Sequence, residues 1–329
     1  MKAGIYGAAG YTGLELIGLL NQHPEFEICF ATSDNYAGQK YQGITFSTSA
    51  DADASTVDLV FLCTPHGVSA PLAARSLDAG AKVVDLSADL RMKTADAYQQ
   101  WYGHTHPVPA LLPTPYGLPE LNRPNLIRQN CIANPGCYPT TTLLGLAPLA
   151  KAKAIRAGAN LIVDAKSGVS GAGRQPKVDI LFSEVFGDFK PYNVGRKHRH
   201  VGEIEQELHA LNPNLGTLIF SPHLIPIDRG LLATSYVPLA EGWTLENVRQ
   251  IYESAYADEP LVTLLPAGET ARVKEVANTN GAMISLHAAT PDTVIVVSVL
   301  DNLRKGAASQ AVQNANLMLN LPETMGLLI

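Results

Sequence analysis

Residues 2–22 read KAGIYGAAGYTGLELIGLLNQ, and this stretch decides the fold of the first part of the chain. A short apolar run over residues 2–6 predicts a buried strand. Leucine and isoleucine then recur at helical spacing over residues 12–22, and Pro24 prevents the helix from continuing. A strand that passes through a glycine cluster into an amphipathic helix is typical of a dinucleotide-binding βαβ unit.

The turn between this strand and this helix contains Gly7, Gly10 and Gly13. Glycine permits the tight turn and lets the backbone approach a pyrophosphate, which then rests on the helix N-terminus. The spacing is GxxGxxG rather than GxGxxG, and the glycines alone would also fit a turn without a ligand. Their place between the first strand and an amphipathic helix favours a dinucleotide site, with Tyr11 and Thr12 among the candidate ligands.

The end of the second predicted strand bears on the choice between NAD and NADP. An acidic side chain there accepts hydrogen bonds from the ribose hydroxyls, whereas serine, arginine or lysine favours a 2′-phosphate. The chain offers Ser33 and Asp34, with Lys40 nearby. These residues leave the choice open, and Ser33 is retained as a candidate cofactor ligand.

The next elements extend the same pattern. Near-continuous apolar runs predict strands over 27–32, 57–63 and 82–86, with a helix over 69–79 between the last two and a further strand near 130–133. Buried strands that alternate with helices indicate a parallel sheet covered on both faces.

The predicted strands in the second half of the chain differ in length and spacing from those in the first half. Longer strands are predicted over 160–165, 218–222, 231–238 and 294–299, without the regular spacing of βαβ units, and residues 306–319 form a helix by composition and period. We therefore expect an α/β protein with a Rossmann-type parallel-sheet domain. A second α+β domain should contain a mixed, largely antiparallel sheet.

Composition limits the classes of function. The chain has 329 residues, which suggests two domains, and its formal charge is −6, from 24 Lys and Arg against 30 Asp and Glu. Without a basic run, a nucleic-acid or membrane-surface partner is not expected. The N-terminus has no signal-peptide pattern, no apolar run is long enough to span a membrane, and the four cysteines suit reduced thiols. We expect a cytoplasmic protein.

The most informative stretch is NPGCYPT at residues 134–140. A strand ends, Pro and Gly make the turn, and Cys137 stands where a helix begins, with Pro139 suited to its first turn. The helix dipole should lower the pKa of this thiol, and the thiolate can displace phosphate from an acyl phosphate to give a thioester. The alternative for any cysteine is a small buried apolar side chain, which is our interpretation of Cys29, Cys63 and Cys131.

Thiolate chemistry of this kind also needs a proton donor. His198 and His200, with Arg199 between them, precede a predicted helix and can supply acid/base groups, although a solvated basic turn is the alternative. His104 and His106 have no third ligand at suitable spacing and are interpreted as loop residues. No metal site is expected.

Two further segments could contact a phosphate or a cofactor. Ser87 and Arg91 follow a strand of the parallel sheet, at the edge where ligands collect, so Arg91 is a candidate phosphate ligand unless it is a surface salt-bridge partner. The loop SGVSGAGR at 167–174 is rich in exposed amides, and its first residues, Ser167 and Gly168, are candidate cofactor ligands.

Together these motifs resemble the N-acetyl-γ-glutamyl-phosphate reductases of arginine biosynthesis over nearly the whole chain. The motifs are GAAGYTG (7–13), TPHG (64–67), DLSADLR (85–91), YGLPELNR (116–123), NPGCYPT (134–140), SGVSGAGR (167–174), HRH (198–200) and DNLRKGAA (301–308). The nucleophile motif with its Tyr-Pro-Thr continuation is specific, whereas the glycine loop alone is not.

The resemblance implies a domain division. Residues 1–138 would form the Rossmann domain, onto which a C-terminal helix over 306–329 packs. Residues 139–305 would form the domain with substrate and oligomer contacts, in a homodimer or homotetramer.

The resemblance also implies an activity. Cys137 would be the nucleophile, NADPH the hydride donor, His198 or His200 the acid/base, and Asn302 a neighbour of the nicotinamide. The substrates would be a small acyl phosphate and, in reverse, inorganic phosphate, with Arg199 as a further candidate ligand. Related semialdehyde dehydrogenases share a Ser-x-x-x-Arg phosphate element, which supports Arg91.

Three alternatives stay open at this point. The motifs fit a reductase for aminoadipyl phosphate, one methylene longer, equally well, because a pocket discriminates a methylene by only ~1–3 kcal/mol. An aspartate-semialdehyde dehydrogenase would carry its catalytic histidine after a glycine late in the second domain, but Leu231 follows Gly230 here. A dinucleotide sensor without catalysis would not need an activated thiolate at Cys137.

Overall fold

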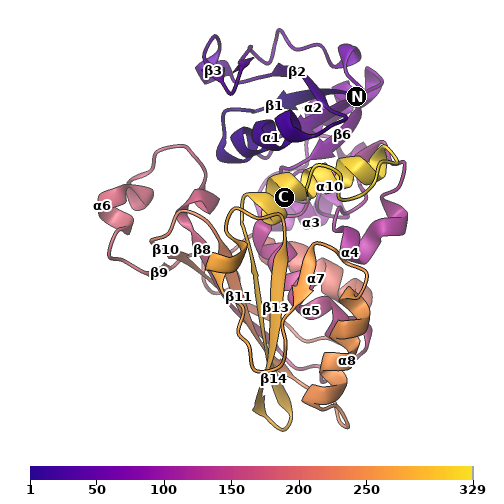
Figure 1. Cartoon of the computed structure of the whole chain (residues 1–329), viewed down its shortest axis with the longest axis vertical. Coiled ribbons are helices and arrows are strands. Elements are labelled where there is room, and N and C mark those ends of the chain that lie inside the picture. Colours follow the sequence, from indigo (N-terminus) through magenta and orange to yellow (C-terminus); the bar gives the residue numbers. More distant parts are fainter. Residues whose placement is uncertain (328–329) are drawn as a thin grey trace. The chain divides into compact units, whose positions relative to one another are not determined.

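The computed structural model describes residues 1–327 and divides the chain into two compact units (Figure 1). The first unit comprises Met1–Gly136 and the described residues from Ala307 onward. The second unit comprises Cys137–Gly306.

The first unit contains a five-stranded sheet in the order β2-β1-β5-β6-β7, and every neighbouring pair in it is parallel. The strands are β1 (Lys2–Tyr6), β2 (Glu27–Ala31), β5 (Leu59–Leu62), β6 (Lys82–Asp85) and β7 (Cys131–Ala133). The strand order reverses between β1 and β5, the place where parallel sheets of this kind bind ligands. A short hairpin of β3 (Lys40–Tyr41) and β4 (Ile44–Thr45) follows β2.

Helices cover this sheet as the alternation of elements predicts, and α1 (Tyr11–Gln22) contacts β2. The other helices of this unit are α2 (Ser69–Asp78), α3 (Ala95–Tyr102), α4 (Pro119–Asn122) and α10 (Ser309–Met318). Helix α2 packs on β5 and β6, and α10 contacts α1 and β6. The helix expected over 306–329 is longer than the one observed, because α10 ends at Met318 and turns follow to residue 327. Residues 328–329 lie outside the described chain.

The second unit contains a seven-stranded sheet in the order β12-β13-β14-β11-β8-β10-β9. Its strands are β8 (Leu161–Gly168), β9 (Lys190–Pro191), β10 (Leu218–Ile225), β11 (Leu231–Pro238), β12 (Val262–Leu264), β13 (Ala282–Thr290) and β14 (Thr293–Leu300). The β8–β10 and β12–β13 pairs are parallel and the others antiparallel. The predicted fold class, a Rossmann-type sheet with a second mixed sheet, is confirmed.

Helices α5 (Cys137–Lys151), α7 (His200–Leu211) and α8 (Leu245–Tyr256) lie along one face of this sheet, as Figure 1 shows. Helix α5 is almost wholly buried and packs on β11, β14 and α7. Short helices α6 (Phe182–Val185) and α9 (Val273–Val276) complete the unit, and α9 packs on β14. In β8, alternate residues are buried, so this strand has one buried face and one more exposed face.

Candidate functional site

The glycine loop follows β1 and leads into α1. Gly7 has φ +75°, and a Cβ there would lie 2.6 Å from the carbonyl oxygen of Cys63. A Cβ on Gly13 would lie 2.5 Å from the carbonyl oxygen of Ala8, so this glycine permits close packing of helix on strand. Gly10 is the N-cap of α1, and its nearest neighbour would be 3.7 Å away. The loop therefore leaves the N-terminus of α1 open, as a bound pyrophosphate requires.

Asp34 is engaged within the first unit. Its Oδ1 accepts from the backbone N–H of Ser49 at 2.7 Å and its Oδ2 from the Ser49 hydroxyl at 3.3 Å. The backbone N–H of the adjacent Ser33 donates to Ser47 at 2.9 Å. The acidic side chain that would accept from ribose hydroxyls thus stabilises a neighbouring turn, while Ser33 remains half-buried at the strand end.

The DLSADLR segment forms a buried polar network after β6. Both the hydroxyl and the N–H of Ser87 donate to Asp85 at 2.9 Å, and burial raises the pKa of Asp85 to about 6. The Ser87 hydroxyl also accepts from the N–H of Asp89, whose carboxylate accepts from the N–H of Gly67 and the hydroxyl of Tyr98. Ser87 therefore orders the loops at this edge of the sheet.

Arg91 is buried, so its interpretation as a surface salt-bridge partner is wrong. Its Nε donates to the carbonyl oxygen of Asn134 at 2.8 Å, and its Nη2 donates to that of Leu86 at 2.7 Å. The side chain of Asn134 in turn donates to Ala307 and accepts from Asn314. The segment that precedes the predicted nucleophile is held on several sides by hydrogen bonds within the first unit.

Cys137 is the first residue of α5 and is half-buried. Its carbonyl oxygen accepts from the Thr141 hydroxyl at 2.8 Å within the first turn. A Cβ on Gly306 would lie 2.9 Å from the Cβ of Cys137, so a glycine is needed beside it. A thiol at a helix N-terminus is stabilised as the thiolate by the helix dipole.

The other three cysteines differ from Cys137 and from one another. Burial, with a contribution from Asp85, raises the pKa of Cys63 to about 12 and raises that of Cys131 as well. Both are poor nucleophiles at neutral pH. The expectation that Cys29 is buried is wrong: it is exposed, because β2 is the edge strand of its sheet.

His198 is buried among aromatic side chains. Its ring lies 5.5 Å from those of Tyr138, Tyr192 and Phe220, so a solvated turn is the wrong interpretation for it. Burial and then the charge of Arg199 lower the pKa of His198 to about 4. Its Nδ1 accepts from the backbone N–H of His200 at 3.2 Å, which leaves the proton of the neutral ring on Nε2.

His200 is the first residue of α7 and is half-buried, while Arg199 is exposed. The His200 ring lies 4.8 Å from that of His198 and 6.1 Å from that of Tyr138, the residue after Cys137. The two imidazoles and the start of α5 are thus neighbours in the second unit. Tyr192, whose hydroxyl donates to that of Tyr138 at 3.3 Å, also belongs here, but no motif in the sequence points to it.

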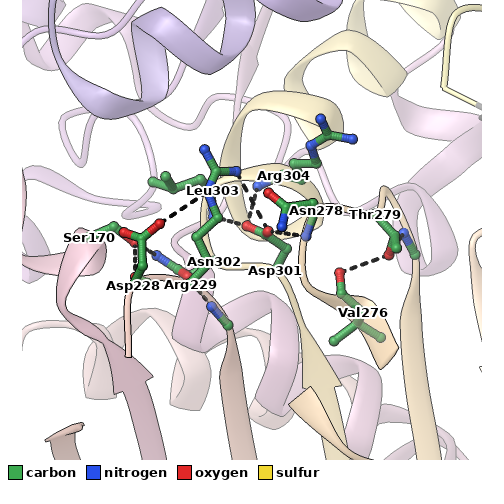
Figure 2. A network of polar contacts seen from close by, with 12 residues as sticks. Ser170, Asp228, Arg229, Val276, Asn278, Thr279, Asp301, Asn302, Leu303 and Arg304 are labelled. Atoms are coloured by element: carbon green, nitrogen blue, oxygen red, sulfur yellow. Dashed lines mark hydrogen bonds and ion pairs between the residues drawn. The ribbon is translucent and has the colours of Figure 1, made fainter. Parts of the chain in front are cut away.

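The 167–174 loop and Asn302 lie together in the second unit (Figure 2). The buried Ser167 donates its hydroxyl to the carbonyl of Gly168 at 3.0 Å. A Cβ on Gly168 would lie 2.6 Å from the carbonyl oxygen of Asp228, so this loop packs closely on the turn before β11. The Nδ2 of Asn302 donates to the hydroxyl of Ser170 at 2.9 Å.

Across residues 1–327, no three His, Cys, Asp or Glu side chains are grouped so that they could bind a metal ion. Over the same residues, no helix combines the length and apolar character that a membrane span requires.

Two family models match the chain. "Semialdehyde dehydrogenase, NAD binding domain" matches residues 2–129, and "Semialdehyde dehydrogenase, dimerisation domain" matches residues 137–302.

Among solved structures, aspartate semialdehyde dehydrogenase II of Vibrio cholerae complexed with ASA has a TM-score of 0.74 at 18% identity, over 97% of this chain and 98% of that chain. The Candida albicans aspartate semialdehyde dehydrogenase with NADP has a TM-score of 0.71 at 16% identity, with the same coverage. These two structures share the fold.

Sequence relatives are considerably more similar. The N-acetyl-gamma-glutamyl-phosphate reductase of Moorella thermoacetica is 45% identical over 99% of this chain and 98% of that protein. The probable chloroplastic N-acetyl-gamma-glutamyl-phosphate reductase of Arabidopsis thaliana is 43% identical over all of this chain and 84% of that protein. Similarity at this level extends over both units.

Proposed function

The chain belongs to the N-acetyl-γ-glutamyl-phosphate reductases of the semialdehyde dehydrogenase family, and from this premise we propose its reaction. It reduces N-acetyl-γ-glutamyl phosphate with NADPH to N-acetylglutamate 5-semialdehyde and phosphate, in arginine biosynthesis. The observation that carries the proposal is the position of Cys137, at the start of a buried helix and directly before Tyr138, whose ring lies 5.5 Å and 6.1 Å from those of His198 and His200.

In the proposed reaction, the Cys137 thiolate attacks the acyl carbon and the bond to phosphate breaks, so that a thioester forms and phosphate leaves. NADPH, when bound, supplies the hydride that reduces the thioester carbonyl. A protein group protonates the oxyanion that forms, and the same group takes the proton back as the thiohemiacetal collapses to the aldehyde and the Cys137 thiolate.

We assign the proton transfer to His200. His198 is buried, has a pKa of about 4 and accepts from the His200 backbone, so it stays neutral at pH 7 and fixes the start of α7. His200 is more accessible and lies beside the same tyrosine. The geometry thus supports His198 as a positioning residue and His200 as the general acid/base.

The remaining assignments concern the cofactor and the phosphate. The open N-terminus of α1 at Gly10 fits the pyrophosphate of the cofactor. Because the Asp34 carboxylate already accepts from Ser49, we expect Ser33 to contact the 2′-phosphate of NADPH rather than Asp34 to accept from the ribose hydroxyls of NADH. The proposed cofactor ligands are Gly7, Gly10, Tyr11, Thr12, Gly13, Ser33, Ser167 and Gly168, and Asn302 lies beside the last of these loops. Arg91, Ser87 and Arg199 are the proposed contacts to substrate or phosphate.

We also propose a homo-oligomer. Ile162, Ile219 and Tyr236 are neighbours across β8, β10 and β11, on the sheet face away from α5, and each is about two-fifths exposed. Apolar side chains in register on an open sheet face suit burial against a second copy.

The absence of disulfides among the four cysteines fits the cytoplasmic location that the sequence predicts.

The test of this function is phosphate-dependent reduction of NADP⁺ by N-acetylglutamate 5-semialdehyde, measured beside the aminoadipate homologue. The proposal predicts a kcat/KM at least ~10-fold higher for the glutamate semialdehyde, the size of discrimination that one methylene permits. A preference for the longer aldehyde would assign the chain to aminoadipyl phosphate instead. No reduction of NADP⁺ with either aldehyde would refute the enzyme activity.

A further inference from the structure

Asn302 lies two residues beyond the end of β14 and is 2% exposed. Both ends of its amide are already engaged (Figure 2). Its Oδ1 accepts from the backbone N–H of Gly230 at 2.7 Å, and its Nδ2 donates to the hydroxyl of Ser170 at 2.9 Å. The side chain therefore joins two segments that lie 72 and 132 residues away along the chain.

The hydrogen bonds have a fixed direction. Ser170 donates its own hydroxyl to the carbonyl oxygen of Asp228 at 2.6 Å, so that its oxygen must accept from Asn302. Because the backbone nitrogen of Gly230 can only donate, the oxygen of the Asn302 amide must face it. A chain of donors thus runs from Asn302 through Ser170 to Asp228.

This chain orders the 167–174 loop against the turn at residues 227–230. The backbone N–H groups of Gly168 and Val169 donate to Gly230 and Ile227 at 2.9 Å, and that of Ser170 donates to Asp228. The Ser170 hydroxyl adds a side-chain donor to these backbone bonds, and the Asn302 amide donates to the oxygen of that hydroxyl. Loss of the Asn302 amide would leave the Ser170 oxygen without its buried donor, although the bond from its hydroxyl to Asp228 could persist.

The turn at residues 301–306 is itself held firmly. The fully buried Asp301 carboxylate accepts from the backbone N–H groups of Asn278 at 2.7 Å, Leu303 at 2.8 Å and Arg304 at 3.2 Å. Its carbonyl oxygen accepts from the N–H of Gly306, the glycine that lies against Cys137. One short turn therefore contacts both the nucleophile and, through Asn302, the 167–174 loop.

We propose that Asn302 is a positioning residue for the reductase reaction, which acts on turnover through Ser170 and the 167–174 loop. This inference rests on the proposed function. Asn302 affects turnover through these hydrogen bonds and not by contacting the reactants, because both ends of its amide are bonded within the protein.

A double-mutant cycle tests this inference. Ser170→Ala, Asn302→Ala and the double variant are compared by kcat and by KM for NADPH. If Asn302 acts through Ser170, each single change lowers kcat about 10-fold, since small misplacements of a reacting group are costly, and the double variant is scarcely worse than either. Ser170→Thr, which keeps the hydroxyl, should recover most of the rate.

Limited trypsin digestion reports on the loop itself, independently of activity. Cleavage after Arg174 should be faster in Ser170→Ala and in Asn302→Ala than in the unaltered protein. The matched control is Ser285→Ala, which removes another buried serine hydroxyl, bonded to the N–H of Ala271, and should change neither kcat nor this cleavage.

The possible failures are distinguishable. Multiplicative losses in the double variant, or a Ser170→Ala enzyme with unchanged rate and cleavage, would overturn the inference while leaving the reductase activity in place. A wild-type chain that does not turn over the acyl phosphate would refute the proposed function instead, and the cleavage rates would still report whether Asn302 orders the loop.

Discussion

Cys137 and Cys63 both follow strands of the same parallel sheet, yet their surroundings give opposite chemistry. Burial, with a smaller contribution from the Asp85 carboxylate, raises the pKa of the Cys63 thiol to about 12. Cys137 begins a helix, where backbone N–H groups stabilise negative charge. Whether a thiol can act as a nucleophile is decided by its position, directly after a strand or at the first residue of a helix.

The two histidines should differ in their effects on turnover. We expect His200→Asn to lower kcat by ~10²-fold or more, the usual contribution of a general acid/base, and His198→Asn to have a milder effect. Steady-state rates of both variants at pH 7 provide the measurement. A larger loss in His198→Asn would exchange the two assignments.

The buried His198 should also make stability depend on pH. Its pKa in the folded state, about 4, is below the ordinary 6.5, so its contribution is fully present above pH 6.5 and is lost as the pH falls toward 4. Between pH 7 and pH 5 this amounts to about 2 kcal/mol of unfolding free energy. Thermal melts of the wild type and His198→Asn at both pH values check this, and an equal loss in both proteins would contradict it.

At the scale of elements, the connection between β7 and α5 determines where the nucleophile stands. Arg91 donates to the carbonyl of Asn134, three residues before Cys137, and the Asn134 side chain is held by Ala307 and Asn314. The sequence predicted the strand, the turn and the helix start. It could not show these bonds, because their partners are 43 to 180 residues apart along the chain.

Arg91→Ala should therefore have two effects. The phosphate concentration needed for half-maximal aldehyde oxidation should rise severalfold, because a guanidinium binds phosphate through charge-assisted hydrogen bonds. The melting temperature should also fall, because the buried carbonyl group of Asn134 and the partly buried one of Leu86 lose their donor. Lysine should restore either property only in part. An unchanged phosphate requirement with a lowered melting temperature would make Arg91 a structural residue alone, and Arg199 the next phosphate candidate.

Other elements show what periodicity can and cannot reveal. Helix α8 was not predicted, although Val248, Tyr252 and Tyr256 are buried at i and i+4 spacing after the N-cap Thr244. The signal was present in the sequence and was missed. Strand β13 was also missed, since its small and polar residues give a weak alternation. The grouping of Asn302 with Ser170 has no local signal at all, because it depends on how β14 and β8 lie in one sheet.

At the scale of the whole molecule, the family assignment and the fold class follow from motifs distributed over the chain, whereas the oligomer does not. The open face of the second sheet gives a specific test. Ile162→Lys should reduce the mass measured by light scattering to that of one chain, 35.1 kDa, because a charge then replaces a buried apolar contact. Ile127→Lys, at a side chain of equal exposure in the first unit, is the control. A wild-type mass of 35.1 kDa would refute the oligomer.

The central claim is that the reaction passes through a thioester on Cys137, and mass spectrometry of the acylated protein tests it most directly. The protein is mixed with N-acetyl-γ-glutamyl phosphate without NADPH, quenched in acid and digested. We predict one acyl group on the Cys137 peptide, removable by hydroxylamine, in the wild type and in Cys131→Ser, and none in Cys137→Ser, which should still bind NADPH. An acyl group on another residue, or turnover by Cys137→Ser, would contradict the account.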